Sequence, residues 1–161
     1  MTPGEVQPEL VGILALKIGA AILCGAIIGL ERQFLKKSAG LRVCILVVFT
    51  TAFFTTLATD YLTEENAIAR IIAGIITGVG FLGAGVIFRG GGHVSGITTA
   101  SLIWALAAIG CTIGLGYPGV AIAVTVVIML VLGLVDLAEY MFPGLRRKRG
   151  SSDDEPHKPA S

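Results

Sequence analysis

Residues 10–30 read LVGILALKIGAAILCGAIIGL, and this stretch decides the fold class because Lys17 is its single charged residue. An α-helix rises about 1.5 Å per residue, so a helix of this length matches a hydrocarbon layer of about 30 Å. The stretch lacks the basic leader and cleavage site of a signal peptide. We therefore expect it to remain in the membrane as a spanning helix.

Similar apolar runs follow along the chain, at residues 41–57, 68–88, 98–115 and 120–137. The composition agrees with them, because 54% of the residues are hydrophobic and 14% are charged. A soluble domain carries roughly 25% charged residues. The sequence therefore predicts an all-α, polytopic membrane bundle of about five transmembrane helices, occupying residues 10–142.

The charges outside these runs predict the orientation, because Lys and Arg are enriched on the cytoplasmic side of a membrane. Residues 31–40 and 146–149 are basic, whereas residues 58–67 are acidic. We predict a short extracytoplasmic N-terminus at residues 1–9 and a cytoplasmic C-terminus. The tail at residues 143–161 is basic at first and then polar, and we expect its polar part to be disordered.

Small residues recur at four-residue spacing, which favours close packing of helices in lipid. A glycine inside a helix costs about 1 kcal/mol relative to alanine, so repeated glycines imply a compensating contact. The sequence leaves open whether that contact lies within one chain or across a homodimer. The predicted packing positions are Gly25, Gly29, Gly74, Gly78, Gly83, Gly85, Gly110 and Gly114.

Polar side chains inside the runs have two interpretations each. Thr51, Thr55 and Thr59 lie at helical spacing. Their hydroxyls are expected to bond to the carbonyl four residues back, with a wet path as the alternative. Lys17 lies about two turns from the predicted outer end of its helix, which favours extension of its ammonium to the membrane surface over a role inside the bundle.

A group of polar residues at the predicted cytoplasmic end is the candidate ligand-binding or functional cluster. We expect the first loops to bring Glu31 close enough to pair with Arg42 or Arg89. Helix N-termini at the same end favour anions, so the cluster predicts a shallow anion-binding funnel, and ordinary interface anchoring is the alternative. The hydroxyls would cap a helix or contact a ligand, capping being preferred. The cluster consists of Glu31, Arg32, Arg42, Arg89, Thr98 and Thr99.

Several function classes find no support in the sequence. Cys24, Cys44 and Cys111 form no pair at metal or redox spacing, and His93 and His157 are the only histidines. We therefore predict no catalytic residue, no metal site, no cofactor and no enzymatic activity. The charge pattern does not suggest nucleic acid as a partner.

Four motifs make the chain resemble the MgtC/SapB family of bacterial membrane proteins. They are GLER at residues 29–32, AGLR at 39–42, GVGFLGAGVIFR at 78–89 and GITTA at 96–100, followed by Trp104. Their order and spacing agree with the family over about residues 10–138. Gln33 and Cys44 depart from it, because an acidic residue and a histidine often stand there, so no metal or proton role of that histidine carries over.

The resemblance implies a multi-pass protein of the bacterial cytoplasmic (inner) membrane, linked to growth under magnesium limitation and, in some pathogens, to survival inside host cells. Longer members add a soluble domain similar to ACT domains, and we expect this chain to be a short form without it. The resemblance further implies non-enzymatic regulation of a membrane complex, and ATP synthase is such a complex for some members. A channel or transporter for an ion or small solute, with an Arg/Glu-lined cytoplasmic cavity, is the alternative.

Overall fold

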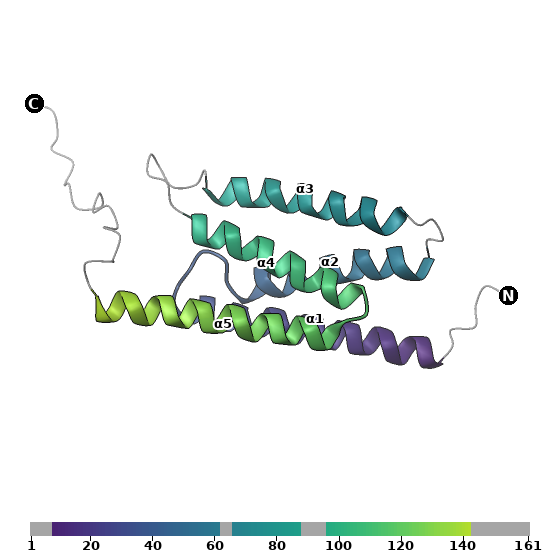
Figure 1. The fold of residues 1–161 in the computed structure, drawn as a ribbon, viewed down its shortest axis with the longest axis horizontal. Helices are drawn as coiled ribbons and strands as arrows, with labels where there is room; N and C mark the ends of the chain where they lie inside the picture. Colours follow the sequence, from purple (N-terminus) through teal and green to yellow (C-terminus); the bar gives the residue numbers. More distant parts are fainter. Residues whose placement is uncertain (1–7, 62–65, 88–95, 143–161) are drawn as a thin grey trace, which may run out of the picture. The chain divides into compact units, whose positions relative to one another are not determined.

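Five α-helices make up the part of the chain that the structure, a computed structural model, describes (Figure 1). The described residues are 8–61, 66–87 and 96–142. Consecutive helices among the first four run in opposite directions (Figure 1). The helices are α1 (Pro8–Phe34), α2 (Leu41–Tyr61), α3 (Ala67–Ile87), α4 (Ile97–Gly114) and α5 (Pro118–Met141).

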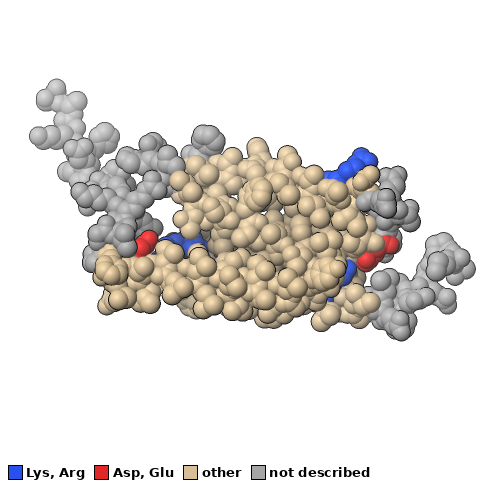
Figure 2. Space-filling model, viewed as in Figure 1, with Lys and Arg blue, Asp and Glu red and all other residues tan. Residues whose placement is uncertain are grey.

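Each of the five helices is long and apolar enough to cross a membrane. The all-α prediction of five spans is therefore confirmed for the described residues, which contain no strand. On the face drawn in Figure 2, charged side chains gather near helix ends, and the long middle parts of the helices show none. An uncharged middle part on this face suits a hydrocarbon environment.

The second helix is longer than its apolar run predicted. It continues to Tyr61, so that Asp60, which we expected in the loop at residues 58–67, lies in its last turn. The hydroxyl of Thr59 explains the extension, because it donates to the Thr56 carbonyl at 2.9 Å and also lies 3.0 Å from the Asp60 carboxylate. Both polar side chains are thus accommodated in helical backbone.

The chain divides into two compact units, Met1–Met129 and Leu130–Ser161, and the boundary falls within α5. The described part of the second unit is the remainder of α5 with Phe142, whose large apolar side chains are mostly exposed. The predicted domain limits at residues 9 and 142 stay predictions, because residues 1–7 and 143–161 lie outside the described part of the chain.

In the first unit, α4 is the most enclosed helix. It packs against α2, α3 and α1, and α2 packs in turn against α1. A small apolar cluster of Val79, Ile103 and Ala107 joins α3 to α4. Because α4 is apolar around its whole circumference, burial among three neighbours is the arrangement that its sequence favours.

Glycine brings α1 into backbone contact with α2. A Cβ atom at Gly25 would lie 2.7 Å from the Ile45 Cα, and one at Gly29 would lie 2.7 Å from the Leu41 Cα. Real Cβ atoms do not approach backbone that closely. Glycine at these two positions therefore permits the α1–α2 contact.

The other glycines on the predicted faces fall into two groups. A Cβ at Gly110 would lie 2.5 Å from the Val48 carbonyl oxygen, and one at Gly114 would lie 2.7 Å from the Ala52 carbonyl oxygen, so α4 contacts α2 closely. Gly83 faces the Ala100 Cβ at an ordinary 3.6 Å. By contrast, open space surrounds Gly74, Gly78 and Gly85 on α3 within the described residues.

Candidate functional site

A buried cation stands at each end of the inner face of α1. Lys17 is 7% exposed and Arg32 is 3% exposed, and small or apolar residues such as Ala21, Cys24 and Ile28 separate them at helical spacing. At about 1.5 Å per residue, the two cations are about 22 Å apart along the helix. We call the surroundings of these residues the Lys17 end and the Arg32 end.

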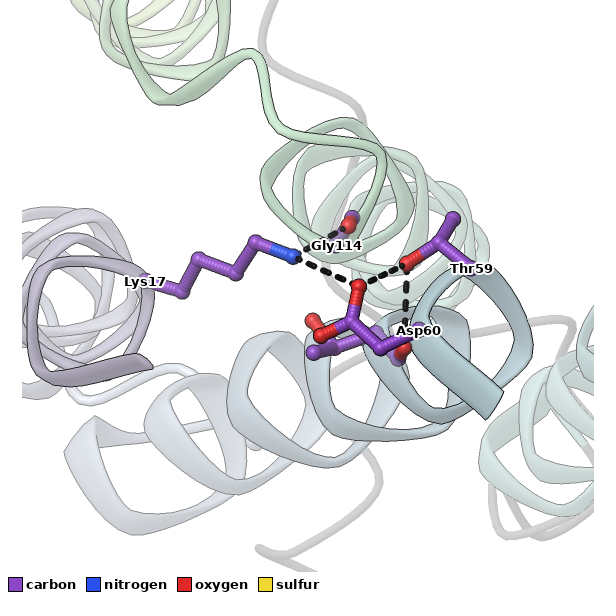
Figure 3. Close-up of polar contacts among 5 residues, drawn as sticks. Lys17, Thr59, Asp60 and Gly114 are labelled. Atoms are coloured by element: carbon purple, nitrogen blue, oxygen red, sulfur yellow. Dashed lines mark hydrogen bonds and ion pairs between the residues drawn. The ribbon is translucent and has the colours of Figure 1, made fainter. Parts of the chain in front are cut away.

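At the Lys17 end, the ammonium is held inside the protein (Figure 3). Its Nζ donates to the Gly114 carbonyl at 3.0 Å and lies 3.9 Å from a carboxylate oxygen of Asp60. Gly114 is the last residue of α4, where the helix dipole is negative and favours a cation. The prediction that Lys17 extends to the membrane surface is therefore wrong, because its charge is compensated by groups of α2 and α4.

A cavity of about 10 Å³ adjoins Lys17, and Ala21, Phe53 and Thr56 are among its lining residues. This volume is close to the minimum that a single water molecule requires. The Lys17 end is consequently a tight contact of three helices. This cavity leaves no room for a ligand larger than water.

At the Arg32 end, the guanidinium is buried without compensation from a described carboxylate. The structure gives the Arg32 Nε no hydrogen-bond acceptor among the described residues. Glu31 is half-buried, and Cys44 near the start of α2 is buried. The described residues include no ion pair between Glu31 and Arg32.

The start of α4 meets the α1–α2 connection at this end. Thr99 is buried, and its hydroxyl lies 3.1 Å from the Ser38 hydroxyl. Thr98, the neighbouring residue, is exposed. The prediction that these threonines cap α4 is wrong, because the N-cap is Gly96 in a left-handed conformation (φ 84°) and no side chain caps the helix.

The remaining arginines of the predicted cluster are Arg42, which the structure describes, and Arg89, which it does not. Arg42 is exposed, and the described residues include no ion pair between Arg42 and Glu31. Arg89 lies outside the described residues, so its predicted pairing with Glu31 stays a prediction.

Between the two ends, the threonines of α2 serve helix packing. As expected, Thr51 bonds to the Val47 carbonyl and Thr55 to the Thr51 carbonyl, both at 2.8 Å. A Cβ at Gly110 would collide with the Thr51 hydroxyl, and one at Gly114 would collide with the Thr55 side chain. The side chains of Thr51 and Thr55 therefore fill the α2–α4 interface.

Metal and redox chemistry find no cluster in the described part of the chain. No group of three or more His, Cys, Asp or Glu side chains there is placed to hold a metal ion. Cys24, Cys44 and Cys111 are free, and the first two are buried.

Sequence reasoning missed Asp60 and Ser38 as site residues, and it predicted Gly114 as a packing position but not as the acceptor for Lys17. Asp60 was assigned to a loop, and the Gly114 contribution is a backbone carbonyl, which no residue type signals. The one available clue was the position of Lys17, an inward-facing cation on a helix of small residues, which requires a counter-charge.

Comparison with known proteins decides the family. The model of the MgtC family matches residues 18–141. The chain belongs to the MgtC family. A Protein MgtC of Salmonella typhimurium (strain 14028s / SGSC 2262) is 44% identical over 114 residues, and one of Brucella abortus (strain 2308) is 39% identical over 118 residues. No solved structure matches the chain.

These alignments cover 71% and 73% of this MgtC family member but 48% and 49% of the two relatives. The chain thus spans about half the length of the curated relatives it matches. In the structure, the family motifs at residues 29–32, 39–42 and 96–100 lie at the end of α1, the start of α2 and the start of α4. The Arg32 end is therefore where the motif residues gather.

Proposed function

We propose that this MgtC family member is a non-enzymatic protein of the bacterial cytoplasmic membrane that supports growth under magnesium limitation by regulating another membrane complex. Family membership supports the membrane setting and the link to magnesium. The observation that favours regulation over transport is the closed α2–α4 interface, in which the threonine side chains pack against Gly110 and Gly114.

A transport path along these threonines would need free hydroxyls and space for a solute. Thr51 and Thr55 instead donate to carbonyls of their own helix. The backbone at Gly110 approaches α2 so closely that even a methyl group does not fit. Neither hydroxyls nor space remain for a hydrated ion in this interface.

The exposed side of α3 suits contact with a partner helix. Gly74 and Gly78 form a smooth face with open space before it, of the kind that lets helix backbones approach in lipid. Beside it, an open groove of about 520 Å³ runs between α3 and α4, and Gly80, Ala84 and Trp104 contribute to its walls. A membrane complex such as ATP synthase, suggested by family resemblance, or a second copy of the chain would contact this surface.

The orientation that we propose places the Arg32 end in the cytoplasm and the Lys17 end outside. Arg32, Lys36, Lys37 and Arg42 all belong to the α1–α2 turn region, whereas Asp60 lies at the opposite end of α2. The excess of cations around the α1–α2 turn supports this orientation.

Purified protein in liposomes tests regulation against transport. We expect no flux of Mg²⁺, K⁺, protons or phosphate above that of empty liposomes. The alternative, a channel or transporter with an Arg/Glu-lined cavity, is favoured by one observation, the uncompensated Arg32 guanidinium. Flux that disappears in Arg32→Gln but persists in Arg42→Gln would establish the alternative and overturn regulation.

Complementation in a strain lacking the protein tests the contact surface. Gly78→Leu places a large side chain on the smooth face of α3, whereas Ile76→Leu changes an exposed residue on a different side of the same helix. We expect Gly78→Leu to be present in membranes at the wild-type amount but to fail to restore growth at low magnesium. Equal growth of the two variants would contradict contact through this face.

A further inference from the structure

We propose that the Arg32 end binds one oxyanion of the phosphate type, with the buried guanidinium of Arg32 as its principal ligand. The site lies where α2 and α4 begin, beside Ser38 and Thr99. This binding site goes beyond the proposed function and stands or falls independently of it, because either a regulator or a transporter could hold such an anion.

Burial of the Arg32 charge without an ion-pair partner among the described residues is energetically costly. A guanidinium carries five N–H donors and a permanent charge, and burial of an uncompensated charge is among the most costly arrangements in a protein. Arg32 is 3% exposed, its Nε has no acceptor among the described residues, and no described carboxylate forms an ion pair with it. An external anion would supply both the charge and the acceptors.

The contacts between α1 and α2 place Arg32 level with the connection between the two helices. Gly25 lies against Ile45, and Gly29 lies against Leu41, so the two helices run antiparallel and α2 begins opposite Gly29. Arg32 is the next inward position of α1. It therefore lies just beyond the first residue of α2, level with the connection that contains Ser38, and Lys37 N–H donates to the Arg32 carbonyl at 3.0 Å.

The Ser38–Thr99 contact brings the N-terminus of α4 close to the connection that leads into α2. The hydroxyls of Ser38, before α2, and of Thr99, in the first turn of α4, are 3.1 Å apart. Neither α2 nor α4 has an acidic residue in its first turn, and α4 has no side-chain cap. Their positive dipole ends are thus not compensated by carboxylates of their own first turns, which favours an anion.

The planar guanidinium of Arg32 fits an oxyanion of the phosphate type. Lys37, in the α1–α2 connection, is half-buried, and Arg42, in the first turn of α2, is exposed. The neighbouring Glu31 is half-buried, and its carboxylate opposes an anion. A phosphate oxyanion offers several acceptors in a geometry that matches the planar fork of arginine.

The same chemistry is available from two sources, free inorganic phosphate and the headgroup of an anionic lipid. The full chain, purified in a neutral maltoside detergent, is therefore titrated with radiolabelled inorganic phosphate and, separately, with short-chain phosphatidylglycerol, at a constant ionic strength set with chloride. We expect saturable binding of at least one probe. Binding of phosphate alone identifies the free ion, and binding of phosphatidylglycerol alone identifies the headgroup.

Variants locate the site. Arg32→Gln is expected to weaken the bound probe at least about tenfold, because charge-assisted hydrogen bonds are lost. Arg70→Gln, at an exposed position of α3 outside the Arg32 end, is the matched control and should change the affinity by no more than about twofold. Arg32→Lys keeps the charge but loses the planar fork, so we expect its affinity to lie between those of the wild type and of a chain without the charge. This variant replaces Arg32→Gln as the test if Arg32→Gln does not fold.

Two results would overturn the proposal. One is the absence of saturable binding of either probe to the wild-type chain. The other is wild-type affinity in a folded Arg32→Gln variant, or in Arg32→Lys where Arg32→Gln does not fold. Neither result bears on solute flux in liposomes, so failure of the anion site is distinguishable from failure of the proposed function.

Discussion

The ammonium of Lys17 in α1 donates a hydrogen bond of 3.0 Å to the carbonyl of Gly114, 97 residues further along the chain. The contact joins α1 to the last residue of α4, and Asp60 adds a carboxylate from α2 at 3.9 Å. Three helices are therefore held together at one end by a single cation. Removal of this charge should weaken the packing of all three helices.

Lys17→Met tests the stabilising effect of this contact. The variant keeps the length and apolar stem of the side chain but loses a charged hydrogen bond, and we expect the free energy of unfolding to fall by about 1–3 kcal/mol. Unfolding is followed by titration with SDS in mixed micelles. Arg70→Met, at an exposed position of α3, is the control, and equal stability of the two variants would show that Lys17 does not hold the helices together.

Gly110→Ala and Gly74→Ala make the same chemical change in two surroundings. A methyl group at Gly110 collides with α2, so we expect a loss of about 1–3 kcal/mol in stability. Open space surrounds Gly74, and alanine there should raise stability by up to about 1 kcal/mol through its helix propensity. The same SDS titration measures both, and a destabilising Gly74→Ala would show that its face is already packed.

Ser38→Ala and Thr99→Val together test the contact between the α1–α2 connection and the start of α4. Because the two hydroxyls are 3.1 Å apart, a double-mutant cycle should give a coupling free energy of about 0.5–1.5 kcal/mol. Thr98→Val replaces Thr99→Val in a second cycle, since Thr98 is exposed, and that cycle should give no coupling. Additive effects in both cycles would mean that the hydroxyls do not interact.

Reporter fusions test the proposed orientation. An alkaline phosphatase fused after Lys37 and one fused after residue 149 should both be inactive, because five spans place both positions in the cytoplasm. A fusion after Asn66, between α2 and α3, should be active and is the positive control. Activity of either of the first two fusions would reverse or break the five-span topology.

The helices were predictable because length and hydropathy alone determine a spanning segment, and each run from residue 10 onward became a helix. The end of α2 was not predictable from the apolar run. The Thr59 hydroxyl lies within hydrogen-bond distance of the Thr56 carbonyl and the Asp60 carboxylate, and both polar residues belong to the helix. Apolar runs show where the lipid lies. They do not show where a polar helix end stops.

The packing contacts were only partly predictable. Gly25 and Gly29 have the same spacing as Gly74 and Gly78, yet the first pair contacts α2 and the second faces open space. Only the position of neighbouring helices separates the two cases. Lys17 was misinterpreted for the same reason, because its acceptor is a backbone carbonyl of a distant helix.

The closed α2–α4 interface carries the proposed function, and the reactivity of a cysteine placed within it tests that claim most directly. In a variant whose Cys24, Cys44 and Cys111 are alanine, Thr55→Cys is exposed in membranes to a charged, membrane-impermeant thiosulfonate from both sides, with Arg42→Cys as the accessible control. We predict that position 42 is modified and that position 55 is not, because Thr55 is fully buried against α4. Modification at position 55 at a rate similar to that at position 42 would reveal a water-filled path and contradict the account.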